Sequence, residues 1–306
     1  MERREPFERV CAMSFGEAWE YFKWSILAIL LAGTTLPVIG AWLFVRRTSF
    51  HGLALPQFAA SGVSLGFLLL PWFVGQGLFG ALPLEEVAAD THAALNYHLS
   101  FAILGTFVGL ALLVLVGDRL GTEGARVAGA FALASAITIL CAHSSPLGEI
   151  FVRGILTGES LVVGVHEFET LAVVLLAGLG LLVWRHNDLL LVSMDPESAF
   201  VFGLPARRVE LLFMIVTGLS VSVGTMSVGP MMLFGLLVLP SMGARPFAKS
   251  MSGFLLLSAG VGFVGAFLGL FVAFRVDLPP SPCVVAGSAV CALPGWLFAG
   301  WQAKSL

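Results

Sequence analysis

Charged residues are scarce in this chain. Asp, Glu, Lys and Arg together make up 11% of its 306 residues, whereas soluble domains carry about 25%. Hydrophobic residues make up 58%, so the polar residues are too few to cover the surface of a water-soluble fold. The composition predicts an integral membrane protein built as one compact multi-helix domain. The net charge of -3 and the lack of a basic stretch give no indication of nucleic-acid binding.

Motifs for disulfides, nucleotide binding and catalysis are also missing. The four cysteines lie far apart without a CxxC pair, so we expect them to pack as small apolar residues. The chain contains no GxxxxGKS or GxxxxGKT phosphate loop, so any ATP that drives it has to be bound by another subunit. It also contains no HExxH helix and no Ser/His/Asp arrangement, and an enzymatic function has no support.

Ionisable residues are almost absent from the centres of the apolar segments. Such residues inside a membrane usually mark a substrate or proton path. Their scarcity counts against a proton-coupled secondary transporter, which needs a titrating group midway across the membrane. A secondary transporter or channel that works without ATP nevertheless stays open as the alternative to a transport subunit driven by ATP. A membrane scaffold or an undetected intramembrane enzyme is a third possibility.

The apolar segments predict an all-α bundle with eight or nine transmembrane spans. A spanning helix needs roughly 20 apolar residues to cross a hydrocarbon core about 30 Å thick. The sixth apolar segment is long, and a Ser-Val-Gly-Pro sequence at 227–230 interrupts it, so it predicts two short helices. If one of these is re-entrant, the number of spans is eight. The charge-free segments are 24–45, 52–84, 99–117, 127–142, 170–184, 211–244, 250–274 and 278–303.

The first 23 residues carry many charges, unlike a signal peptide, and predict an amphipathic lead-in helix on the membrane surface. Residues 24–306 then form a single transmembrane domain. With nine spans and the N-terminus outside, ten of the 16 Lys and Arg residues fall in inner loops; the reverse topology places only six there. The basic residues near the N-terminus oppose this orientation. GxxxG pairs at 62–66, 105–109 and 265–269 predict close helix packing.

The loop between the fifth and sixth spans contains a short helix with both ends marked. Asp195 can cap the free N–H groups at its start, and Pro196 suits the first helical position. Glu197 complements the positive end of the helix dipole. Gly203 can adopt the left-handed conformation that closes a helix, and Pro205 prevents its continuation.

This short helix is apolar, although arginines flank its loop. It carries Ala199, Phe200, Val201 and Phe202, and at roughly two turns it is too short to span a membrane. An apolar helix at the inner face is expected to have a partner surface. It either rests in the lipid headgroups or acts as a coupling helix that docks into a cytoplasmic motor domain.

Several motifs resemble those of the permease subunits of zinc, manganese and iron ABC importers. The run LLLVSMDPESAFVFGLPARR at 189–208 is similar to the family's LLxVSFDPExAxAxGVPxRR stretch. Further similarities occur in the family's order at 43–52, 144–148 with 158–159, 228–245 and 277–282. The resemblance covers most of the chain from residue 24 onward.

The resemblance implies the membrane-spanning permease of an ATP-driven metal-ion importer in the inner membrane. The helix at 195–203 is then the coupling helix. A second permease copy, in a homodimer or a pair with a related permease, completes the translocation path. Two cytoplasmic ATPase subunits bind the ATP, this chain holds no cofactor, and an extracytoplasmic binding protein delivers the ligand.

The sequence departs from the family where metal ligands are usual. The family's second helix usually begins GDALSHA, with an Asp and a His one turn apart that face the path. Leu53 stands in place of that Asp, and Gln57 stands in place of the His. Gln57 can still offer a carbonyl oxygen, and His51 lies nearby, so these two are the candidates for the path. A chelate, another ion or a different ligand all stay open.

A second group of possible metal ligands precedes the third span. Asp90, His92 and His98 supply one carboxylate and two imidazoles, which could pass a metal ion inward if they converge in space. A solvated loop that leads into a helix explains the same residues.

Overall fold

The computed structural model describes residues 15–46, 48, 51–76, 91–116, 122–145 and 163–304. All regular structure within these ranges is helical, which confirms the predicted all-α bundle. Nine of the helices are long and apolar enough to cross a membrane, so the long sixth segment does supply two spans. The nine are α2 (Phe15–Val45), α3 (His51–Gly75), α5 (Thr91–Val116), α6 (Glu123–His143), α8 (Val165–Trp184), α11 (Ala206–Val228), α12 (Pro230–Ala244), α13 (Met251–Val276) and α14 (Pro280–Lys304).

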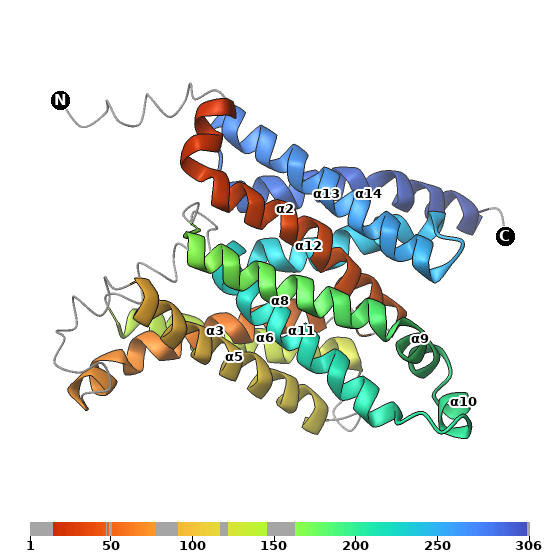
Figure 1. Ribbon diagram of the computed structural model, residues 1–306, viewed down its shortest axis with the longest axis horizontal. Helices are drawn as coiled ribbons and strands as arrows, with labels where there is room; N and C mark the ends of the chain where they lie inside the picture. The colour runs from red at the N-terminus through yellow and green to blue at the C-terminus, as the bar shows by residue number, and fades with distance from the viewer. Residues whose placement is uncertain are drawn as a thin grey trace.

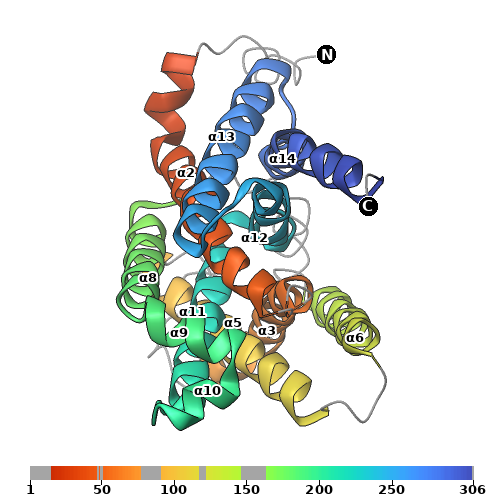
Figure 2. The same cartoon turned by 90° about the vertical axis from the view of Figure 1, so that its right-hand side faces the viewer.

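The bundle has a buried centre and two lateral pairs of helices. The spans α2, α3, α11 and α12 are the most buried, because neighbouring helices cover them. On one side α13 and α14 pack together against α2 and α12, and on the other α5 and α6 pack against α3 (Figures 1 and 2). The span α8 covers α2 and α11. The buried polar side chains of the described residues are hydroxyls, Gln57 and His98.

The predicted interruption at 227–230 separates α11 from α12. Gly229 has a φ of 85°, a value that glycine adopts without the steric cost of a side chain. Pro230 then occupies the first position of α12, where its missing N–H is not needed. At 15 residues, α12 is about 22 Å long, and a short 3-10 helix over Arg245–Phe247 extends it.

The three predicted glycine pairs lie where helices cross. A Cβ atom on Gly62 would come within 2.1 Å of the carbonyl oxygen of Phe101 in α5, and one on Gly105 within 2.4 Å of that of Phe58 in α3. A Cβ atom on Gly269 would come similarly close to the backbone of α14. Only glycine permits these approaches, so the pairs determine how the lateral helices pack.

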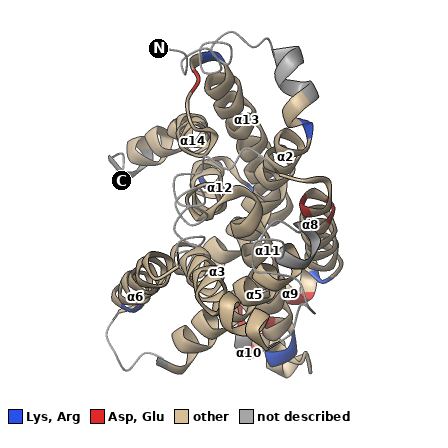
Figure 3. Ribbon diagram, turned by 90° about the vertical axis from the view of Figure 1, so that its left-hand side faces the viewer, with Lys and Arg blue, Asp and Glu red and all other residues tan. Residues whose placement is uncertain are grey.

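Charged residues are few on the ribbon of the described helices (Figure 3), and they lie near the ends of those helices. At one end of the bundle the last turn of α2, the start of α11 and the connection from α12 to α13 lie together (Figure 1). This end is called the basic end here, and it is the end that the Lys and Arg distribution predicts to be inside. Among the residues whose exposure the structure describes, the exposed basic residues at this end are Arg207, Arg208, Arg245 and Lys249.

The first described helix is kinked near the predicted domain boundary. Phe22 in α2 has non-helical angles, with φ −115° and ψ 20°. The surface position predicted for the lead-in segment and the boundary between 23 and 24 stay predictions, since residues 1–14 lie outside the described ranges.

Candidate functional site

Two short helices connect α8 to α11 at the basic end: α9 (His186–Met194) and α10 (Pro196–Val201) (Figure 1). Sequence reasoning predicted only the second as a helix. Arg185 lies between α8 and α9, and its Nη1 is 2.9 Å from Oδ2 of Asp188. The buried face of α9, formed by Leu189 and Val192, belongs to the main hydrophobic core. Therefore α9 is anchored to the bundle along its length.

The start of α10 has the predicted cap. The backbone N–H of Ser198 donates to Oδ1 of Asp195 at 3.0 Å, and the Ser198 hydroxyl donates to the other carboxylate oxygen. Both hydrogen bonds, and above all the one from the Ser198 hydroxyl, hold the pKa of the Asp195 carboxyl below its usual range. Pro196 occupies the first helical position and Glu197 lies in the first turn, as expected. The cap is therefore ionised at neutral pH.

The end of α10 has the predicted glycine closure. Gly203 has a φ of 71°, and its N–H donates to the carbonyl of Phe200 at 3.0 Å. The N–H of Leu204 donates to the carbonyl of Ala199 at 3.0 Å. This pair of hydrogen bonds is the Schellman arrangement, which stops the helix after less than two turns.

The side chains of α10 divide into an anchor and an exposed surface. Ala199 is fully buried and joins the main core. Phe200, Val201 and Phe202, the α10 patch, are 80%, 82% and 75% exposed. Consecutive apolar side chains this exposed at the end of a membrane bundle are expected to contact another protein or the lipid headgroups.

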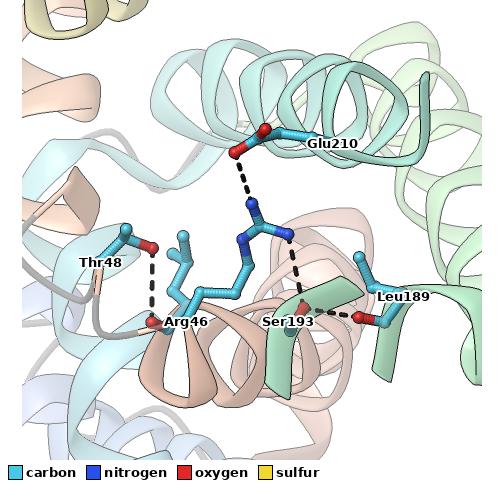
Figure 4. Close-up of polar contacts among 6 residues, drawn as sticks. Arg46, Thr48, Leu189, Ser193 and Glu210 are labelled. Atoms are coloured by element: carbon cyan, nitrogen blue, oxygen red, sulfur yellow. Dashed lines mark hydrogen bonds and ion pairs between the residues drawn. The ribbon is translucent and has the colours of Figure 1, made fainter. Parts of the chain in front are cut away.

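Arg46 connects the short helices to the first span (Figure 4). Its Nη2 donates to Oε1 of Glu210 in α11 at 2.7 Å, and its Nη1 donates to the Ser193 hydroxyl in α9 at 3.4 Å. Ser193 in turn donates to the carbonyl of Leu189 at 2.6 Å. The guanidinium lies 5.1 Å from the ring centre of Phe213. Burial lowers the pKa of Arg46 and Glu210 opposes that shift, so the group stays charged.

A second contact joins α9 to α2 one turn before Arg46. The buried ring of Trp42 meets the ring of His186 edge-on, with centroids 5.4 Å apart. Two contacts one turn apart fix α9 against the end of α2. The span α2 that α9 contacts is among the most buried spans of the bundle.

The pair of Arg46 and Glu210 was missed by the sequence reasoning. Arg46 entered the sequence analysis as one of the inner-loop cations and as part of the motif at 43–52, and Glu210 was not singled out. The two lie 164 positions apart, and no local pattern links them. The one available signal was a cation in the motif at 43–52 and an acidic residue shortly after the motif at 189–208.

The structure separates the two residues predicted for the path. Nδ1 of His51 lies 3.3 Å from Oε1 of Glu123 and 3.2 Å from the carbonyl oxygen of Thr48, so His51 joins the starts of α3 and α6. Gln57 is buried about 9 Å further along α3, at a rise of about 1.5 Å per residue. Leu53 is half-buried between them. A role of either residue in the path stays a prediction.

Of the other predicted ligands, Asp90 and the side chain of His92 lie outside the described residues. His98 is buried, with its ring stacked on Phe67 at 3.8 Å between centroids. Within the described ranges no three His, Cys, Asp or Glu residues come close enough to hold a metal ion. The metal role of this group is therefore untested, and His98 itself packs as an aromatic ring.

Comparison with known proteins gives one family and several relatives. The ABC 3 transport family matches residues 18–299. The chain is 24% identical to the manganese import system permease protein ScaB of Streptococcus pneumoniae, over 94% of each chain. It is 23% identical to the chelated iron transport system membrane protein YfeD of Yersinia pestis, covering 88% of this chain and 82% of that one.

One more relative and one solved structure are similar to this chain. The high-affinity zinc uptake system membrane protein ZnuB of Haemophilus influenzae is 22% identical, covering 86% of this chain and 92% of that one. The structure of PsaBC from Streptococcus pneumoniae in complex with Fab superposes with a TM-score of 0.74 and 20% identity, covering 92% of this chain and 94% of that one. At this identity the likeness shows a shared fold.

Proposed function

Because this chain belongs to the ABC 3 transport family, we propose that it imports a transition-metal ion, or a chelate of one, across the inner membrane. The chain is a multi-pass membrane permease, a transport subunit and not an enzyme. Three relatives that cover most of its length belong to systems for manganese, chelated iron and zinc, which supports a substrate of this class. The observation that carries the function is the capped helix α10 at the basic end of a nine-span bundle.

The proposed importer contains further subunits. Two cytoplasmic ATPase subunits bind ATP, and one docks on the α10 patch of each permease copy. An extracytoplasmic binding protein delivers the ligand at the opposite end, and a second permease copy, identical or related, completes the path. Support comes from the family and from the exposure of the patch, because an apolar surface of this kind gains free energy when a partner covers it.

A secondary transporter or channel, the alternative, has less support. The relatives named above belong to import, transport or uptake systems in which they are the permease or membrane protein. The family is an ABC family, in which a separate subunit supplies the ATPase activity.

The contacts at the basic end suggest how ATP could drive the bundle. An ATPase that closes on ATP moves α10, and short connections join α10 to α9 before it and to α11 after it. Arg46 holds α9 and α11 to the end of α2. A rocking motion of the short helices would then shift α2 between two arrangements, inward-open and outward-open.

Measuring the metal content of cells tests the proposed function. Cells without this protein should contain less of one metal among manganese, zinc and iron when that metal is limiting. A plasmid copy of the wild-type chain should restore the content. Equal contents of all three metals with and without the protein, under limitation of each, would show that the substrate belongs to another class.

Restoring the family's ligand pair should give this chain a zinc site. In the Leu53→Asp/Gln57→His double variant, the two new side chains lie one turn apart on one face of α3. Zinc affinity should rise by about tenfold or more, since even a change in the residues that orient the ligands of a metal site alters its affinity by about that factor. Calorimetry on the purified protein measures it. The Leu53→Asn/Gln57→Leu variant is the control, and equal zinc binding by both would show that these positions do not face the path.

A further inference from the structure

A groove of about 840 Å³ opens at the basic end, between the end of α2, α9 and the connection from α12 to α13. The groove is lined by apolar residues, among them Phe44, Leu190 and Met194, and by the basic residues Arg46, Arg245 and Lys249. No Asp or Glu is among the described residues that line it. An amphipathic molecule with an anionic head would match this mixture of apolar and basic side chains.

The charge of the groove comes from Arg245 and Lys249. Arg46 is already neutralised by Glu210, 2.7 Å away. Arg245 and Lys249 are both exposed, and neither forms an ion pair with any described residue. Among the described residues, the guanidinium of Arg245 interacts with the ring of Phe254, and its Cζ lies 5.9 Å from the ring centre. Two cations with no ionic partner among the described residues thus line a space that also has apolar lining residues.

The groove lies at the depth of the lipid headgroups. Span α2 ends at Val45 and α13 begins at Met251, so the hydrocarbon core ends beside them. Trp184 at the end of α8 and Trp301 near the end of α14 are each 73% exposed at this end, as is usual for tryptophan at a membrane–water interface. Arg245 lies in the last turn of the span Pro230–Phe247 and Lys249 lies just beyond it, at the level where lipid phosphates are found.

We propose that this groove binds an anionic phospholipid, with the phosphate between Arg245 and Lys249 and an acyl chain against Phe44 and Met194. An acidic protein segment fits less well, because the groove borders the spans α2 and α13 at the edge of the hydrocarbon core, where an acyl chain can lie along Phe44. The α10 patch lies beyond α9, away from the α12–α13 connection (Figures 1 and 2). The lipid would bridge α2, α9 and α13 and hold the short helices at a fixed depth.

Native mass spectrometry of the purified full-length chain tests this proposal. Phosphatidylglycerol and phosphatidylcholine with identical acyl chains are titrated into the detergent-solubilised protein, and retained lipid is counted. The wild type should bind phosphatidylglycerol more tightly, and the Arg245→Gln/Lys249→Gln variant should bind it about tenfold more weakly. The ratio of the two lipids is measured within one sample, so a general loss of folded protein would not mimic the result.

The matched control is Arg207→Gln/Arg208→Gln, which removes the same charge from exposed residues at the same end but outside the groove. This control should keep the wild-type preference. An equal loss in both variants, or no loss in either, would overturn the proposal. So would displacement of the lipid by millimolar inorganic phosphate, which indicates a phosphate site, or release of a cytoplasmic ATPase by the groove variant with its lipid retained, which indicates a protein segment.

Discussion

Replacing Phe200 and Phe202 with Asp should release the ATPase subunit from the permease. Both side chains are exposed by three quarters or more, so their replacement removes the apolar surface on which the ATPase is proposed to dock. Aromatic anchors at protein interfaces contribute about 2 kcal/mol or more each, so the loss of both should lower the affinity by about a thousandfold. Co-purification of the ATPase with tagged permease from membranes measures the loss.

The fold of the variant should be unaffected, because α10 is held by Asp195, Gly203 and the buried Ala199 rather than by the two rings. The control is Phe200→Tyr/Phe202→Tyr, which keeps the aromatic surface and adds no charge. That control should retain the ATPase. If the Asp variant also retains it, α10 rests in the lipid headgroups and is not the coupling helix.

Much of the fold follows from local sequence signals. The spans are apolar runs long enough to cross a membrane, and the break at Gly229 needs only glycine and proline side by side. The ends of α10 were predicted for the same reason, since Asp195 and Gly203 act within three residues of their own positions. Local hydrogen bonds of this kind depend little on the rest of the chain.

The parts that were not predicted depend on residues far apart in sequence. The helix α9 has no capping residue at its start, and burial of Leu189 and Val192 against the core stabilises it instead. His51 was proposed for the path because it lies near Gln57 in sequence. In three dimensions its ring faces Glu123, 72 positions away, since α3 and α6 begin at the same end of the bundle.

Replacing Arg46 with Gln should reduce transport while the ATPase stays bound. The change removes the ion pair with Glu210 and the hydrogen bond to Ser193, so α9 and α11 lose their polar link to α2. The α10 patch is unaltered, and docking should therefore continue. Metal uptake should fall by about tenfold, which lies within the usual range of coupling between distant sites. Uptake and co-purification of the ATPase are measured on the same membranes.

The matched control is Arg185→Gln, at the same end, whose partner Asp188 lies only three residues away. Breaking that local pair leaves α2 connected, so uptake should stay close to wild type. In Arg46→Glu/Glu210→Arg the ion pair is reversed, and uptake should recover above that of either single variant, because only a direct interaction is restored by exchange of the two charges. Full uptake in Arg46→Gln, or loss of the ATPase together with uptake, would show that Arg46 does not transmit motion from the short helices to the first span.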